Sequence, residues 1–252
     1  MDFIVLTLSF LLGSFLNVCI YRIPRSESIA LPGSRCPHCG IRLKPLDLVP
    51  VLSFIFLRGK CRHCCQPISW RYPVVELLTT LLLWLTYEVY GITFTAIYYA
   101  AIICILIVIA FIDLEYQVIP NGLVLSLIGT GLGFKLLDGG AGFIDGLYGI
   151  VAGGGPLLLI AVVSSLLFRK EGMGGGDIKL MASIGWCLGW RLVLLSFVIS
   201  IYIGGLISLL LLAFKVKKRG DYIPYGPFIV MATVVSMLWG DGVISWYINN
   251  FW

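Results

Sequence analysis

The fold is decided by the stretch Ala96-Ile-Tyr-Tyr-Ala-Ala-Ile-Ile-Cys-Ile-Leu-Ile-Val-Ile-Ala-Phe-Ile112, which has no charged residue and is followed at once by Asp113. A helix needs roughly 20 mostly apolar residues to cross a bilayer. Lipid offers no partners for exposed backbone groups, so such a run must be helical. The chain has eight segments of this kind, at about 3–20, 73–90, 96–112, 119–137, 145–168, 178–190, 192–214 and 225–248.

These segments predict an all-α polytopic membrane protein with about eight transmembrane helices. Of the 252 residues, 59% are hydrophobic and 12% are charged, which is about half the charged fraction of soluble domains. The first segment does not have the pattern of a cleaved signal peptide, because Asp2 precedes it and no small-x-small site follows. We expect the short sixth segment to be tilted or to join a buried turn near Gly189.

The basic residues predict the orientation. If the N-terminus lies outside, 16 of the 18 Lys and Arg residues fall on the cytoplasmic side, counting Lys179 at its edge. Lys135 and Arg191 are left for the other face. This is the positive-inside pattern, and it explains the net charge of +5 by lipid contact rather than by nucleic acid. We expect a multi-pass protein of the cytoplasmic (inner) membrane, with both termini outside and cytoplasmic segments at about 21–72, 113–118, 169–177 and 215–224.

One polar, basic segment interrupts the apolar pattern. Residues 22–72 hold five of the eight cysteines. We therefore divide the chain into a first transmembrane helix (1–21), a small cytoplasmic zinc-ribbon-like insertion (22–72) and a helical membrane core (73–252). The other cysteines, Cys19, Cys104 and Cys187, stand singly in apolar stretches and are expected to pack in the core.

Within the insertion, the cysteines form two C-x-x-C pairs separated by 21 residues, Cys36/Cys39 and Cys61/Cys64. This spacing is typical of a four-thiolate zinc site, and the metal would supply folding free energy to a module with little core. A closed four-thiolate site has a structural role. Disulfides are the alternative, disfavoured in the reducing cytoplasm. The neighbouring Cys65, or a histidine of either pair, leaves the ligand set open.

Two aspartates are the candidate catalytic residues. Asp113 ends the third apolar segment, and Asp177 follows the glycine-rich run 172–176 and begins the sixth, so both fall at the cytoplasmic edge. Two carboxyls that share a proton can act as base and acid, and glycines beside Asp177 would let a substrate backbone approach. Taken singly, Asp177 is better explained as an N-cap and Asp113 as a solvated helix end; only together do they suggest a catalytic pair.

Six blocks in order resemble the type IV prepilin peptidase (leader peptidase/N-methyltransferase) family. Three precede the core: Gly13-Ser-Phe-Leu-Asn-Val-Cys-Ile-Tyr-Arg-Ile-Pro24, Ser34-Arg-Cys-Pro-His-Cys-Gly40 and Ser69-Trp-Arg-Tyr-Pro-Val-Val-Glu-Leu77. Three lie within it: the Asp113 segment ending in Ile119-Pro-Asn121, the segment Gly174-Gly-Gly-Asp-Ile-Lys179, and Tyr225-Gly-Pro227.

The resemblance implies a bifunctional enzyme. It would cleave the leaders of prepilins or pseudopilins, in pilus assembly or protein secretion, after a glycine at the cytoplasmic membrane face. It would then N-methylate the new terminal residue with S-adenosylmethionine as co-substrate. Asp113 and Asp177 take the catalytic positions, and Cys36, Cys39, Cys61 and Cys64 take the zinc positions. For methyl transfer, the candidates are four polar residues near the same edge, with helix-end anchoring as the alternative: Asn17, Arg22, Arg71 and Glu76.

Three rival functions remain at the level of sequence. An ion-coupled transporter with a structural zinc ribbon predicts acids near the bilayer midplane and paired broken helices. A non-enzymatic membrane scaffold predicts that Asp113→Asn is harmless. A presenilin-like peptidase would share the chemistry with a different substrate, and the opening block and the cysteine insertion argue against it.

Overall fold

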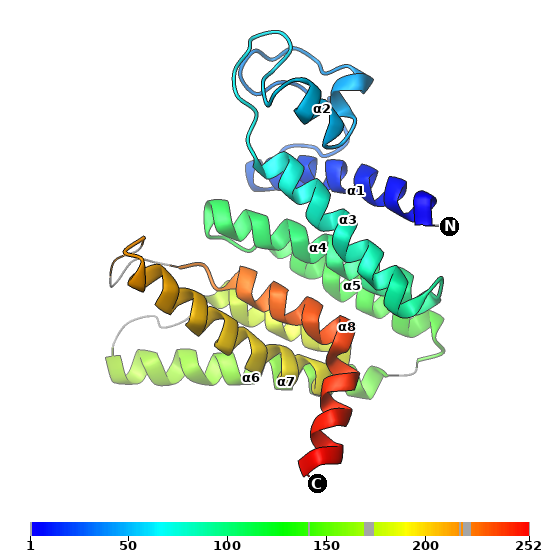
Figure 1. Cartoon of the computed structure of the whole chain (residues 1–252). Helices are drawn as coiled ribbons and strands as arrows, with labels where there is room; N and C mark the ends of the chain where they lie inside the picture. The colour runs from blue at the N-terminus through cyan, green and yellow to red at the C-terminus, as the bar shows by residue number, and fades with distance from the viewer. Residues whose placement is uncertain (1, 141, 169–173, 217, 219–222, 252) are drawn as a thin grey trace. The chain divides into compact units, whose positions relative to one another are not determined.

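The computed structural model describes residues 2–140, 142–168, 174–216, 218 and 223–251 (Figure 1). Gly172 and Met173 of the glycine-rich run, and four of the basic residues used for topology, lie outside the described residues: Arg169, Lys170, Lys217 and Arg219. The described residues contain helices and no β-strand. In order, the elements are α1 (Asp2–Arg22), η1 (Ile23–Arg25), η2 (Pro45–Leu48), α2 (Leu52–Phe56), α3 (Arg71–Tyr90), α4 (Phe94–Tyr116), α5 (Asn121–Leu137), α6 (Phe143–Phe168), α7 (Gly175–Ala213) and α8 (Gly226–Phe251).

The architecture is that of a polytopic membrane protein. Among the described residues, 5 helices are long and apolar enough to cross a membrane, namely α1, α4, α6, α7 and α8. Helix α5 is apolar but shorter, with 17 residues. Each of the eight predicted apolar segments is helical over most of its length, and two of them are joined within α7.

Contacts divide the chain into two compact units, Met1–Val108 and Ile109–Trp252. In the first unit α1 packs along α3. Gly13 permits this contact, because a Cβ there would lie 2.8 Å from the Cα of Glu76. In the second unit α7 is central and packs against α5, α6 and α8.

Helix α7 is broken at Gly189, which has φ 80° and ψ 174°. Only glycine adopts this left-handed backbone easily, and a side chain here would also collide with the carboxylate of Asp145. Met181 and Val193, on opposite sides of the break, both contact Gly153 of α6. The chain therefore doubles back at Gly189, which confirms the predicted turn.

Glycines on α6 allow its close approach to α7. A Cβ on Gly149 would overlap the carbonyl oxygen of Gly185, and a Cβ on Gly185 would overlap that of Gly149. Small residues four apart are the usual means by which membrane helices bring their backbones together. This contact holds the part of α7 that precedes the break at Gly189, which we call the first arm of α7 and which carries Asp177 near its start.

Candidate active site and metal centre

Asp113 lies in the last turn of α4 with 3% of its surface exposed. Its Oδ2 accepts a hydrogen bond of 3.1 Å from the backbone N–H of Gly226, the first residue of α8. A Cβ at position 226 would lie 2.6 Å from that oxygen, so the contact requires glycine. The alternative of a solvated helix end is therefore wrong for Asp113.

Asp177 is the third residue of α7 and is 6% exposed. The N-cap is Gly174, so the N-cap alternative for Asp177 is wrong as well. The carboxylate faces Gly174, where a Cβ would come within 3.1 Å of Oδ2. Asp177 is close enough to interact electrostatically with both Asp113 and Tyr225. The second unit thus brings the two predicted aspartates together.

The three sequence blocks of the core meet around this pair. A Cβ on Gly176, beside Asp177, would lie 3.2 Å from the Cβ of Ile119. Lys179 donates a long hydrogen bond of 3.4 Å to the side chain of Asn121. From the third block, the Tyr225 hydroxyl lies 2.7 Å from that of Ser200 on α7. Loop residues between α4 and α5 are thereby fixed against the start of α7.

The pair is not neutralised by a neighbouring cation in the described part of the chain, where neither aspartate forms a salt bridge. Two buried carboxyls at one site cannot both ionise cheaply. Two such carboxyls would be suited to sharing one proton. By contrast, Glu115, two residues beyond Asp113, is exposed.

The four predicted zinc cysteines also come together, in the first unit. The Sγ atoms of Cys36, Cys39, Cys61 and Cys64 all lie within 4.8 Å of one another, and Cys36 and Cys64 are 3.8 Å apart. A tetrahedral zinc with Zn–S bonds of about 2.3 Å separates its sulfurs by about 3.8 Å. The backbone N–H groups of Cys64 and His63 lower the pKa of Cys61 to about 7, whereas burial and the neighbouring cysteines raise the pKa of Cys64 to about 12.

The two cysteine turns share one backbone pattern. In the first turn, the N–H of Cys36 donates to Ile41 O, and the N–H of Gly40 donates to Cys36 O. In the second turn, the N–H of Cys61 donates to Gln66 O, and the N–H of Cys65 donates to Cys61 O. Cys65 thus occupies the position of Gly40, and both are left-handed, with φ 56° and 70°. Cys65 is exposed and outside the sulfur cluster. Each turn is closed by one isolated bridge, without the strands of a zinc ribbon in the described residues.

The four polar residues predicted for methyl transfer lie in the first unit. Asn17 donates a 3.1 Å hydrogen bond to Tyr72 O, joining α1 to α3, and the Arg71 guanidinium lies 5.1 Å from the Tyr72 ring. Arg22 donates to Ser28 O and Pro32 O at 2.8 and 2.6 Å. Glu76 accepts the Val51 N–H at 2.7 Å. Arg22 and Glu76 therefore anchor the insertion.

Sequence reasoning missed the role of Gly226. Its block, Tyr225-Gly-Pro227, carries no side chain of acid–base or nucleophilic type beyond a phenol, and the contact with Asp113 is made by a backbone N–H. The resemblance marks the block as a whole, and the glycine itself stands at the start of an apolar helix, a position that glycine has in many helices.

Comparisons with known proteins agree with this architecture. The Bacterial Peptidase A24 N-terminal domain matches residues 7–90, and the Type IV leader peptidase family matches residues 100–209. The chain is 35% identical to the prepilin leader peptidase/N-methyltransferase of Aeromonas hydrophila, over 98% of this chain and 94% of the relative. The proteins of the same name from Legionella pneumophila and Bacillus subtilis (strain 168) are also 35% identical, covering 97% and 95% of this chain and 93% and 94% of theirs.

No solved structure matches the chain. The relatives, however, are matched over nearly their whole length, and the two family matches take in both the cysteine insertion and the aspartate pair. The chain therefore belongs to the type IV leader peptidase family.

Proposed function

We propose that this protein is a membrane-embedded aspartic endopeptidase. It cleaves the leader of type IV prepilins or pseudopilins at the cytoplasmic membrane face and then N-methylates the new terminal residue with S-adenosylmethionine. Family membership supports both activities. The observation that carries the peptidase is the buried pair of Asp113 and Asp177, each at the end of an apolar helix.

The hydrogen bond from Gly226 supports different roles for the two carboxyls. A donated N–H favours the ionised form of a carboxylate, so Asp113 is the base and Asp177 the acid. Asp113 takes a proton from a water molecule while the oxygen of that water attacks the scissile carbonyl carbon. At the same time Asp177 gives its proton to the carbonyl oxygen. Asp113 then protonates the departing amine, and Asp177 takes a proton back as the carboxylic acid product forms.

For the topology, we propose eight spans in the inner membrane, with the two arms of α7 counted separately and both termini outside. The support is the doubling back at Gly189 together with the distribution of basic residues. A transporter with midplane acids is less favoured, because Asp113 and Asp177 lie in the last and first turns of their helices.

For the first unit, we propose a structural zinc held by Cys36, Cys39, Cys61 and Cys64, and we keep Asn17, Arg22, Arg71 and Glu76 as candidates for methyl transfer. Among these four, Asn17 offers an atom suited to a ligand: its buried Oδ1 has no hydrogen-bond partner in the described residues. Buried acceptors are seldom left without a partner, so a bound donor there would complete the site.

The test is cleavage of a purified prepilin by the purified full chain, with products separated by mass. Asp113→Asn and Asp177→Asn should each lower the cleavage rate about 10⁴-fold or more, as loss of a catalytic group does elsewhere. Glu115→Gln, an exposed acid on the same helix, is the matched control and should cleave normally. Normal cleavage by either aspartate variant would remove the dyad. A product heavier by one methylene group, formed only with S-adenosylmethionine, tests the methyl transfer.

A further inference from the structure

An apolar patch on the cysteine insertion is exposed in the part of the chain that the structure describes. We call it the η2–α2 patch and define it as Leu46, Val49, Leu52, Ile55 and Phe56. Leu46 is 74% exposed, Ile55 62% and Phe56 82%. Residues of these types are usually buried, and exposed apolar clusters mark interaction surfaces.

The short helix α2 turns its apolar face outward. Leu52, Ile55 and Phe56 stand at positions i, i+3 and i+4 and are all exposed, so they share one face of the helix. Phe54, at a different position on the helix, makes a tilted ring contact with Trp70, with centroids 4.9 Å apart.

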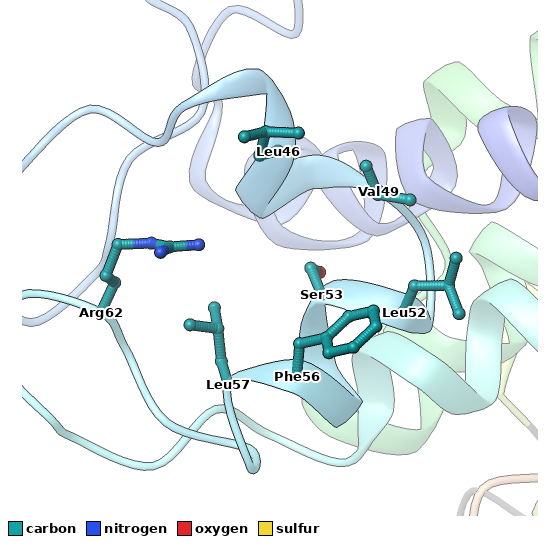
Figure 2. Close-up of a pocket in the computed structure, with 7 residues that line it drawn as sticks. All are labelled: Leu46, Val49, Leu52, Ser53, Phe56, Leu57 and Arg62. Carbon is teal, nitrogen blue, oxygen red and sulfur yellow. The ribbon is translucent and has the colours of Figure 1, made fainter.

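The patch surrounds a pocket of about 240 Å³ (Figure 2). Leu46, Val49, Leu52 and Phe56 line it on the apolar side, and Arg62 stands at the opposite edge. The Arg62 guanidinium is held by Asp47 at 2.8 Å. The pocket therefore combines apolar walls with a basic edge that is already paired.

The η2–α2 patch is connected through Val51 to helices α3 and α1 of its own unit. Val51, which directly precedes α2, donates its N–H to Glu76 in the second turn of α3. The backbone of Glu76 contacts Gly13 of α1. Gly13 stands nine residues before the cytoplasmic end of α1 at Arg22, which is about 14 Å along the helix axis. The start of α2 is therefore tied to the side of the helices α1 and α3, and lipid would border this side if the two helices span the membrane.

The charge of the insertion favours an anionic lipid surface. Residues 23–70 carry two acidic residues, Glu27 and Asp47, against seven basic ones: Arg25, Arg35, Arg42, Lys44, Arg58, Lys60 and Arg62. Arg58 and Lys60 directly follow α2 and are exposed. Basic residues beside an apolar helical face are the pattern of interfacial lipid binding.

We propose that the η2–α2 patch inserts into the lipid interface of the bilayer, with Arg58 and Lys60 against anionic phosphate headgroups. The cysteine insertion is then a peripheral membrane module as well as a loop between two spans, and lipid contact limits its motion over the membrane surface. The proposal goes beyond the catalytic assignment and does not depend on it.

The test places the photoreactive residue p-benzoylphenylalanine at position 56 of the full chain, reconstituted in vesicles of phosphatidylglycerol or of phosphatidylcholine. This residue retains the aromatic ring of Phe56, whose exposed side chain has little packing to lose. The matched control carries it at His38, an exposed residue of the first cysteine turn. We expect lipid adducts at position 56 and none above background at position 38. The yield of lipid adducts at position 56 should be about five-fold or more higher in phosphatidylglycerol vesicles than in phosphatidylcholine vesicles.

The adducts are identified by mass. A crosslink from position 56 to an added prepilin or to a second copy, in place of lipid, would overturn the proposal, and so would equal labelling at positions 56 and 38. Equal lipid yields in the two kinds of vesicle would overturn the headgroup contact. The same probe at Ile55 provides a second variant, and retained zinc content shows that the insertion is folded.

Discussion

At the scale of single residues, the aspartate site depends on a group that has no side chain. Gly226 supplies a backbone N–H to Asp113 and leaves the space that the carboxylate fills. The position of the Asp113 carboxylate, which we propose as the base, is therefore set by the first residue of α8 rather than by another ionisable group. A side chain added at position 226 should therefore displace the Asp113 carboxylate and lower the rate of cleavage.

Gly226→Ala is the first prediction. The new Cβ would lie 2.6 Å from Oδ2 of Asp113, so the carboxylate must move, and a displacement of about 1 Å costs on the order of 100-fold in rate. We expect prepilin cleavage to fall by about that factor while the thermal unfolding temperature changes little. Gly122→Ala at the start of α5, where a Cβ meets nothing within 4 Å, should cleave normally. Full activity of Gly226→Ala would show that this contact does not position the base.

The second prediction concerns Cys65. Because Cys65 occupies the left-handed position that Gly40 holds in the other turn, Cys65→Gly should keep its zinc. Relief of left-handed strain and the greater freedom of glycine in the unfolded chain nearly cancel, so stability should stay within about 1 kcal/mol. Cys64→Ser should instead lose zinc, measured as metal per purified chain. The opposite pair of results would make Cys65 the fourth ligand.

At the scale of elements, the first arm of α7 is held by backbone contact with α6. The two helices approach so closely at Gly149 and Gly185 that neither position has room for a methyl group. The glycines were visible in the sequence, but their partners were not, because a glycine four residues from another predicts a close contact without saying which helix it meets.

Gly149→Ala is the third prediction. Its Cβ would overlap backbone atoms of Gly185, which cannot move aside as a flexible side chain can. We expect a loss of about 1–3 kcal/mol in the free energy of unfolding, followed by thermal unfolding in detergent. Gly155→Ala, on the same helix and with nothing within 4 Å, should be neutral or more stable by up to about 1 kcal/mol. Equal stability of the two variants would contradict the packing argument.

At the scale of the whole molecule, the proposed topology puts the cysteine insertion and the aspartate pair on the cytoplasmic side. Cys65 is a native reporter of this, since it is exposed and lies outside the zinc cluster, whereas Cys19 and Cys187 are buried. The fourth prediction is that a membrane-impermeant maleimide labels Cys65 in inverted membrane vesicles and not in intact cells. Cys65→Ser should remove the signal. Labelling from outside intact cells would reverse the topology.

The sequence by itself determined the helical membrane class, the eight apolar segments, the turn near Gly189 and the sets of cysteines and aspartates. These follow from local properties of the sequence: the length of each apolar segment, the distribution of charged residues and the spacing of ligand residues along the chain. Only the tertiary structure decided that Asp113 meets Gly226, 113 residues away, and that Arg22 and Glu76 hold the insertion. Such contacts depend on which helix faces pack together, and periodicity along the sequence does not specify the partner of a face.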